Sequence, residues 1–445
     1  MTRPQLIIAP GKEKALLRRH PWVFSGAVRR VEGKPQEGDL VDICAADGTW
    51  LATGLYEGGS IICKVLSFDT PDIDRAFFRD LLASAIDYRR SMGFVPLRPL
   101  EPLEPLKPLR PLMPLMPLRP LTPLRPLKPL GEALTNVFRL VHAEGDGLPG
   151  LVCDWYNGVL VMQAHSVGMH LRFPMFVELF RELLGDALLS VFDKSRTTVP
   201  GGCDDGYLWG ITPDEWEITE NGNRMLINFF EGQKTGFFLD QRNNRKLVAD
   251  LARGRRVLNC FGYTGGFSLA ALRGGAEYVE TVDISKKAIE LCNRNVELNF
   301  PGCTNHRGTV ADVLDFLAQP KGRATRQGTA DVSPAEAHSG AAYDFIILDP
   351  PAFAKHKSAL KNALIGYRRL NAKAFSKIQS GGVLFTFSCS QAVSKEQFRL
   401  AVFSAAAQSR RKVRILHQLT QPADHPINIY HPEGEYLKGL VLWVE

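Results

Sequence analysis

The feature that most constrains the fold is an alternation of short apolar runs with longer amphipathic runs, which begins near residue 231. The apolar runs predict strands at 256–259, 278–283, 343–348 and 383–387. The amphipathic runs predict helices at 266–273, 285–299, 358–379 and 394–409. Because strands that alternate with helices indicate βαβ units, we expect an α/β domain with a doubly wound, mostly parallel sheet over residues 231–445. Within it, 319–342 is rich in small and charged residues and predicts a flexible insertion.

The preceding residues predict two smaller domains. Residues 1–72 consist of short apolar runs separated by glycine-containing turns, which favours a small β-barrel. Residues 73–95 have helical periodicity and predict a connecting helix. Residues 131–230 combine both kinds of run and predict a central α+β domain.

A repeat of Pro-Leu-x separates the connecting helix from the central domain. It covers residues 96–130 and contains 12 prolines at three-residue spacing, which forbids helices and sheet ladders and favours polyproline II. We interpret it as an inert linker; a docking motif for an aromatic groove is the alternative. The repeat also carries +4 of the net charge of +7, so net charge by itself is weak evidence for binding of nucleic acid.

Composition excludes several classes of protein. Of the 445 residues, 45% are hydrophobic and 23% are charged, as in ordinary globular proteins. No apolar run approaches the ~18 residues that a membrane span needs, and the N-terminus lacks a signal-peptide core, so we expect a cytoplasmic protein. The eight cysteines form no Cys-x-x-Cys pair, which argues against a zinc site and a disulfide framework.

Ligands of open α/β sheets bind outside the carboxyl ends of the strands. After the predicted strand 256–259, the run NCFGYTGGF at 259–267 contains glycines that let the backbone approach a ligand at a helix N-terminus. The spacing differs from Gly-x-Gly-x-x-Gly, which disfavours a dinucleotide-binding fold, and a purely structural turn is the alternative. The candidate ligand-binding residues of this run are Asn259, Phe261, Tyr263, Thr264 and Gly265.

Two acidic residues follow later strands. Asp283 ends the predicted strand 278–283, where a carboxylate can accept both hydroxyls of a ribose; capping of the next helix is the alternative. Asp312 follows Thr309-Val310-Ala311 and is a candidate partner for an adenine amino group, with a helix cap nearly as well supported.

The last two strand ends predict a reactive site. Asp349 and Pro350 begin the turn Asp-Pro-Pro after a buried strand, and this rigid turn should project the carboxylate into the cleft; a plain strand-ending turn is the alternative. Cys389 ends the next strand between two serines. Because the two strands are expected to be neighbours, Cys389 should lie near Asp349, and we interpret it as a nucleophile rather than as an inert core cysteine.

These residues resemble the motifs of class I S-adenosylmethionine-dependent methyltransferases. More closely, the chain resembles the RlmI-like (YccW-like) family of 23S ribosomal RNA cytosine-5 methyltransferases. The family hallmarks are GKEKALLRRHPWVFSG at 11–26, HAEGDGLPG at 142–150, GQKTGFFLDQRNNR at 232–245 and DHPINIYHPEGEYLK at 424–438.

The resemblance implies an N-terminal PUA domain, a central α+β domain and a Rossmann-like methyltransferase domain with S-adenosylmethionine as cofactor. It implies that Gln241 and Arg242 help to hold the cofactor or to order the loop over it, although an ion pair of Arg242 with Asp240 is an alternative. Ribosomal RNA of the large subunit would be the substrate, with no membrane and no metal involved; a homodimer stays open.

The expected chemistry agrees with this resemblance. Cytosine C5 has no lone pair with which to attack a methyl group, so a thiolate must first add to C6. Cys389 would supply that thiolate and Asp349 would hydrogen-bond the base. The group that removes the C5 proton is not identified; Glu433 and Glu435 are candidates.

Arg18, Arg19 and His20, beside Trp22 and Phe24, are candidates for RNA binding; the alternative is that the two aromatic residues belong to the core of the N-terminal domain. One departure concerns residues 193–203, DKSRTTVPGGC, where the family pattern leads us to expect Arg-Ser-Asp. Two alternatives remain: methylation of another RNA base or a small molecule, and a non-catalytic RNA-binding factor for ribosome assembly.

Overall fold

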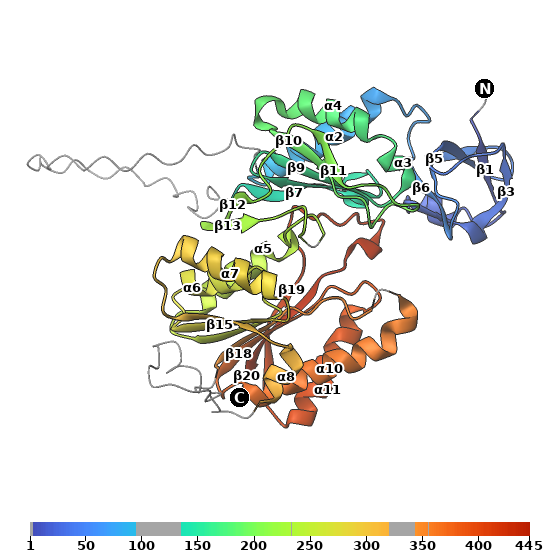
Figure 1. The fold of residues 1–445 in the computed structure, drawn as a ribbon. Coiled ribbons are helices and arrows are strands. Elements are labelled where there is room, and N and C mark those ends of the chain that lie inside the picture. The colour runs from blue at the N-terminus through green and yellow to red at the C-terminus, as the bar shows by residue number, and fades with distance from the viewer. Residues whose placement is uncertain (1–2, 95–134, 233, 320–342, 355) are drawn as a thin grey trace, which may run out of the picture.

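The computed structural model describes residues 3–94, 135–232, 234–319, 343–354 and 356–445. Figure 1 shows a small domain formed by the N-terminal residues beside a central domain, with the C-terminal domain packed below the central one. The repeat at 96–130 and nearly all of the insertion at 319–342 lie outside the described residues, so the expectations about them stay predictions.

The N-terminal domain is a six-stranded mixed sheet in the order β2-β6-β5-β4-β1-β3. Its elements are β1 (Gln5–Ile8), α1 (Lys14–Leu17), β2 (Trp22–Phe24), β3 (Val28–Glu32), β4 (Leu40–Cys44), β5 (Trp50–Tyr56) and β6 (Ile61–Ser67). Gly33, Gly38 and Gly48 have positive φ angles in the turns between strands, as the glycine pattern predicted. The strands enclose a separate apolar core.

The central domain is a five-stranded sheet in the order β11-β10-β9-β8-β7, covered on one face by α2 and α4. Its elements are α2 (Arg75–Ser91), β7 (Val137–His142), β8 (Leu151–Tyr156), β9 (Val159–Ala164), α3 (Val167–His170), α4 (Phe173–Leu184), β10 (Ser190–Asp193) and β11 (Gly206–Trp209). A hairpin follows, made of β12 (Trp216–Glu220) and β13 (Asn223–Ile227). Asn295 and Asn299 accept hydrogen bonds from the backbone of β13, which attaches the hairpin to the C-terminal domain.

The C-terminal domain is a seven-stranded sheet in the order β16-β15-β14-β17-β18-β20-β19. Its strands are β14 (Arg256–Cys260), β15 (Tyr278–Asp283), β16 (His306–Val310), β17 (Phe345–Leu348), β18 (Gly382–Ser388), β19 (Val413–Leu419) and β20 (Lys438–Val444). Its helices are α5 (Arg242–Leu251), α6 (Gly266–Arg273), α7 (Lys286–Asn299), α8 (Val313–Ala318), α10 (Leu360–Lys377) and α11 (Lys395–Ser409). The predicted doubly wound α/β fold is confirmed.

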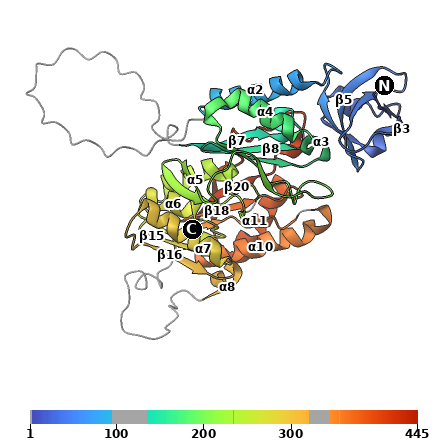
Figure 2. The ribbon, with the colours of Figure 1, turned by 45° about the horizontal axis from the view of Figure 1, so that its top comes forward.

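Helices cover both faces of this sheet, as Figures 1 and 2 show, with α5, α6 and α7 on one face and α8, α10 and α11 on the other. Side chains of β17 alternate between the two: Phe345 and Ile347 face the first core, Ile346 and Leu348 the second. A strand buried on both faces requires a continuous apolar run, which explains the sequence at 345–348. The first core continues into the central sheet through Val159 and Phe192, so the two domains share apolar packing.

One part of the sheet departs from the parallel pattern. β20 lies antiparallel between β18 and β19, and 18 residues separate β19 from β20. This arrangement places the segment 420–437 across the carboxyl edge of the sheet, next to the central domain. Among the described residues, no helix has the length and apolarity needed to cross a membrane.

Candidate active site

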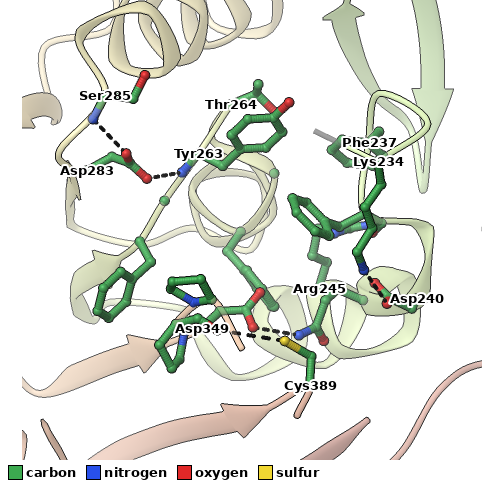
Figure 3. A pocket seen from close by; sticks show the side chains of 18 of the residues that line it. Lys234, Phe237, Asp240, Arg245, Tyr263, Thr264, Asp283, Ser285, Asp349 and Cys389 are labelled. Atoms are coloured by element: carbon green, nitrogen blue, oxygen red, sulfur yellow. Dashed lines mark hydrogen bonds and ion pairs between the residues drawn. The ribbon is translucent and has the colours of Figure 1, made fainter. Parts of the chain in front are cut away.

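A cavity of 220 Å³ lies at the carboxyl ends of β14, β15, β17 and β18. Figure 3 shows side chains from these strand ends on one side of it and side chains from the segment before α5 on the other. The strand-end residues that line it include Phe261, Tyr263, Thr264, Asp283, Asp349, Pro350 and Cys389. The segment before α5 contributes Lys234, Phe237, Phe238, Asp240 and Gln241.

The turn from β14 into α6 has an unusual backbone. Phe261, Tyr263 and Gly265 have φ angles of 59°, 46° and 87°, and only glycine adopts such values without strain. A Cβ on Gly262 would lie 2.2 Å from Cγ2 of Thr281, and one on Gly265 would lie 2.4 Å from Sγ of Cys292. Strained non-glycine residues cost about 1–3 kcal/mol each and cluster at ligand sites. The two glycines are thus packed too closely to be replaced by larger residues, and the strained turn 261–264 lines the cavity.

Asp283 is fixed by backbone donors at the end of β15. Its carboxylate accepts hydrogen bonds from the backbone N–H of Tyr263 (3.0 Å) and of Ser285 (2.8 Å). The side chain of Ser285, and not that of Asp283, caps α7. Because each carboxylate oxygen accepts more than one hydrogen bond, Asp283 can still receive the two hydroxyls of a ribose.

Four of the predicted site residues do not line the cavity. Asn259 is buried behind the turn, where its amide donates to Ser268 (2.9 Å), and Gly265 packs against α7. The side chain of Asp312 caps α8. Arg242 forms a buried ion pair at 2.6 Å, and its partner is Asp424 rather than Asp240. Asn259 and Arg242 are therefore buried residues that do not line the cavity.

Asp349 and Cys389 lie in one cavity because β17 and β18 are neighbours in the sheet. Asp349 accepts a hydrogen bond from Nε2 of Gln241 (3.0 Å). Burial, aided by the nearby Asp240 carboxylate, raises the pKa of Asp349 to about 7. The thiol of Cys389 points to the carbonyl of Pro350 (3.9 Å), and burial raises the pKa of this thiol to about 11. At neutral pH, Cys389 is thus a thiol and Asp349 is divided between its two protonation states.

Two lysines interact with the thiolate form of Cys389, and neither was singled out from the sequence. Lys234 lies 3.6 Å from Asp240, and its charge favours the anionic forms of both Cys389 and Asp349. Lys438 is buried and donates to the carbonyls of Ser390 (2.7 Å) and Val393 (2.8 Å); burial lowers its pKa to about 8.

The two glutamates considered as bases lie elsewhere. Glu433 lies 3.5 Å from His20 of the N-terminal domain, and Glu435 pairs with Lys395. Neither lines the cavity.

The basic residues predicted to bind RNA lie where the N-terminal domain meets the segment 420–437. Arg18 is exposed, and Arg19 forms a two-point ion pair with Asp69 (2.6 and 3.0 Å). The rings of Trp22 and His431 lie 4.4 Å apart. Phe24 is 47% exposed, so it is not a core residue of the domain.

Numbered within the domain, the strand order is 3-2-1-4-5-7-6, with strand 7 antiparallel. This order, a glycine turn after strand 1 and an acid after strand 2 define the class I S-adenosylmethionine-dependent methyltransferase fold. The residues present fit this cofactor: Asp283 keeps acceptors for a ribose, and the close-packed Gly262 leaves the turn open toward the cavity. A family model of S-adenosylmethionine-dependent methyltransferases matches residues 194–430, and a PUA-like domain model matches residues 6–68.

The chain belongs to the ribosomal RNA large subunit methyltransferase I family, and S-adenosylmethionine is its cofactor. The relative from Aeromonas salmonicida is 37% identical over 98% of both chains, and the one from Escherichia coli is 34% identical over 98% of both. Among solved structures, an S-adenosylmethionine-dependent methyltransferase from Streptococcus mutans shares the fold at 22% identity, with a TM-score of 0.75 over 99% of this chain and 100% of that chain. A methyltransferase solved with S-adenosylhomocysteine shares it at 22% identity, with a TM-score of 0.76 over the same shares of the two chains.

Proposed function

We propose that this chain methylates carbon 5 of a cytosine in ribosomal RNA of the large subunit, with Cys389 as the covalent nucleophile. The observation that carries the proposal is the position of Cys389 in the same cavity as Asp349. A methyltransferase that acts on an exocyclic amine needs no thiol, whereas transfer to C5 requires activation at C6. The names of the 34–37% identical relatives support ribosomal RNA as the substrate.

In the proposed reaction, Asp349 and Cys389 prepare the cytosine. Since the pKa of Asp349 is about 7, its protonated form is available to donate a hydrogen bond to N3 of the base. This bond draws electron density from the ring and makes C6 more electrophilic. Sγ of Cys389, as the thiolate, then bonds to C6, and the C5–C6 π electrons move to C5.

When bound, S-adenosylmethionine would supply an electrophilic methyl group: C5 would take up this methyl as its bond to sulfur breaks with the electron pair on sulfur, and S-adenosylhomocysteine would leave. A base then removes the proton from C5, the electron pair restores the C5–C6 double bond, and the Sγ–C6 bond breaks to return the thiolate. Because the pKa of Cys389 is about 11, the returned thiolate takes up a proton at neutral pH, and this proton must leave again before the next turnover. Lys234 and Lys438 supply the positive charge that favours the thiolate.

Arg18, Arg19 and the ring of Phe24 are proposed to bind RNA away from the reacting base. They lie on the PUA-like domain, where basic and exposed aromatic side chains suit a phosphate backbone and unstacked bases. Asp283 and the turn 261–264 are proposed to hold the cofactor, and Gln241 to orient Asp349.

The test uses S-adenosylmethionine with a labelled methyl group and ribosomal RNA that lacks its own modification, followed by identification of the labelled nucleoside. We expect label in 5-methylcytosine, none with Cys389→Ala, and full labelling with Cys303→Ser, a control at a half-buried cysteine outside the cavity. Label in another nucleoside would contradict the proposed base specificity. RNA binding without any turnover would instead support the non-catalytic assembly factor.

A further inference from the structure

Three side chains with metal-ligating atoms meet in the central domain, away from the methyltransferase cavity. His170 ends α3, Asp193 ends β10, and Cys203 lies in the loop between β10 and β11 (Figure 1). One ligating atom from each lies within 4.8 Å of the other two. Nε2 of His170 and Oδ2 of Asp193 are 2.8 Å apart. Among the described residues, this is the one group of three or more such side chains that meets these distances.

The backbone around the cluster holds each ligand in place. Asp193 accepts the backbone N–H of Ser195 on Oδ1 (2.9 Å), which leaves Oδ2 directed at His170. Gly201 and Gly202 have φ angles of 85° and 75°, and this pair of left-handed residues turns the loop back so that Cys203 approaches β10. The backbone of β10 and of the loop at 201–203 therefore sets the positions of Asp193 and Cys203.

The charge around Cys203 is negative. The carboxylates of Asp193, Asp204 and Asp205 lie around its thiol. Lys194 is nearby, but it lies 3.4 Å from Asp205 and donates to the carbonyl of Phe230. A bound cation would offset these negative charges and would stabilise the thiolate form of Cys203.

We propose that His170, Asp193 and Cys203 form a binding site for one divalent cation of the Zn²⁺ type, with water as the fourth ligand. Imidazole nitrogen, carboxylate oxygen and thiolate sulfur are the three kinds of ligand that zinc takes in proteins. Bond lengths of about 2.0–2.3 Å in a tetrahedron place ligand atoms roughly 3.3–3.6 Å apart. The His170–Asp193 hydrogen bond must therefore open by about half an ångström on binding, and the Cys203 thiol releases its proton to solvent.

The site would fasten the segment 194–203 to α3. This segment is where the chain departs from the family pattern, and Lys194 within it contacts Phe230, close to the cavity-lining Lys234. The site is separate from the methyltransferase cavity, because none of its three ligands lines that cavity.

The test titrates tag-free, chelator-treated protein in a phosphine reductant, first with Zn²⁺ against a chromophoric chelator and then with Co²⁺. We expect one equivalent of tight binding and a Co²⁺ spectrum with a thiolate charge-transfer band and strong tetrahedral bands. Cys203→Ser should abolish the charge-transfer band and weaken binding at least about 100-fold, beyond the loss typical of changes around a metal site. Cys389→Ala, at a half-buried cysteine that also lies near carboxylates, should leave both unchanged.

His170→Gln provides a second variant that keeps side-chain size, and circular dichroism checks the fold of each variant. Loss of binding in a folded His170→Gln protein supports the site even if Cys203→Ser does not fold. Failure of the wild-type protein to bind one equivalent, or binding that survives in the folded variants, would overturn the proposal.

Discussion

The buried ion pair between Arg242 and Asp424 offers a sharp test of how the domains are held together. Both side chains are at most 4% exposed, and two hydrogen bonds of 2.6 and 2.9 Å join them. Asp424 also accepts the backbone N–H of Arg139 in the central sheet (2.9 Å). One carboxylate therefore connects α5 of the methyltransferase domain, β7 of the central domain and the segment 420–437.

Asp424→Asn keeps the size of the side chain but turns a hydrogen-bond donor toward the guanidinium. Because a buried guanidinium is left without its counter-charge, we expect a loss of about 3–5 kcal/mol in the free energy of unfolding. The matched control is Glu215→Gln, which breaks an Arg294–Glu215 pair with two similar bonds of 2.5 and 2.7 Å. That pair is about half exposed, so its loss should cost less than about 1 kcal/mol.

The assay is urea unfolding followed by circular dichroism, at neutral pH and in acid. Burial favours the neutral form of Asp424, but Arg242 and His425 together outweigh it and hold the pKa of this carboxyl well below 3.8. A carboxyl whose pKa is lower in the folded state stabilises the protein above its unfolded pKa and loses that contribution as the pH falls through the folded pKa. The difference in the free energy of unfolding between wild type and Asp424→Asn should therefore become smaller as the pH falls below 3.8. Equal losses for Asp424→Asn and Glu215→Gln would refute this reasoning.

Three further predictions concern the cavity. The rate of Cys389 alkylation should rise with pH up to about 11, because burial raises the pKa of the thiol and only the thiolate reacts; a plateau near pH 8 would contradict this. Lys234→Met should slow that alkylation at pH 8 without changing circular dichroism, because it removes a charge that favours the thiolate; an unchanged rate would exclude this role. Gly262→Ala should weaken S-adenosylmethionine binding at least tenfold by calorimetry, because its Cβ would lie 2.2 Å from Thr281; wild-type affinity would show that the turn can widen without cost.

The sequence predicted the parallel part of the sheet well because its strands and helices are local patterns. The predicted helix at 266–273 and strand at 278–283 match α6 and β15 in full. β19 and β20 were not predicted. β19 is largely exposed at the sheet edge, and β20 pairs antiparallel only after a long excursion of the chain, so neither leaves a local pattern that identifies its neighbour.

The candidate site also contains residues that the sequence pattern brings together and residues that it does not. Asp283, Asp349 and Cys389 follow directly from strands, so the geometry of a parallel sheet is enough to bring them together. Lys234 and Asp240 reach the cavity from a segment that precedes the first strand of the domain, and no spacing rule connects them to Cys389. The proposed metal ligands come from three separate segments, so a search for local motifs such as Cys-x-x-Cys could not find them.

The most direct test of the central claim is capture of the Cys389 adduct on RNA. Ribosomal RNA with 5-fluorocytosine at the target cannot lose a proton from C5, so the Sγ–C6 bond should persist after methyl transfer. We predict a complex that survives denaturing electrophoresis, needs S-adenosylmethionine and maps to Cys389 by mass spectrometry of the digested protein. Methylation of cytosine C5 by Cys389→Ala, or an adduct on another residue, would contradict the account.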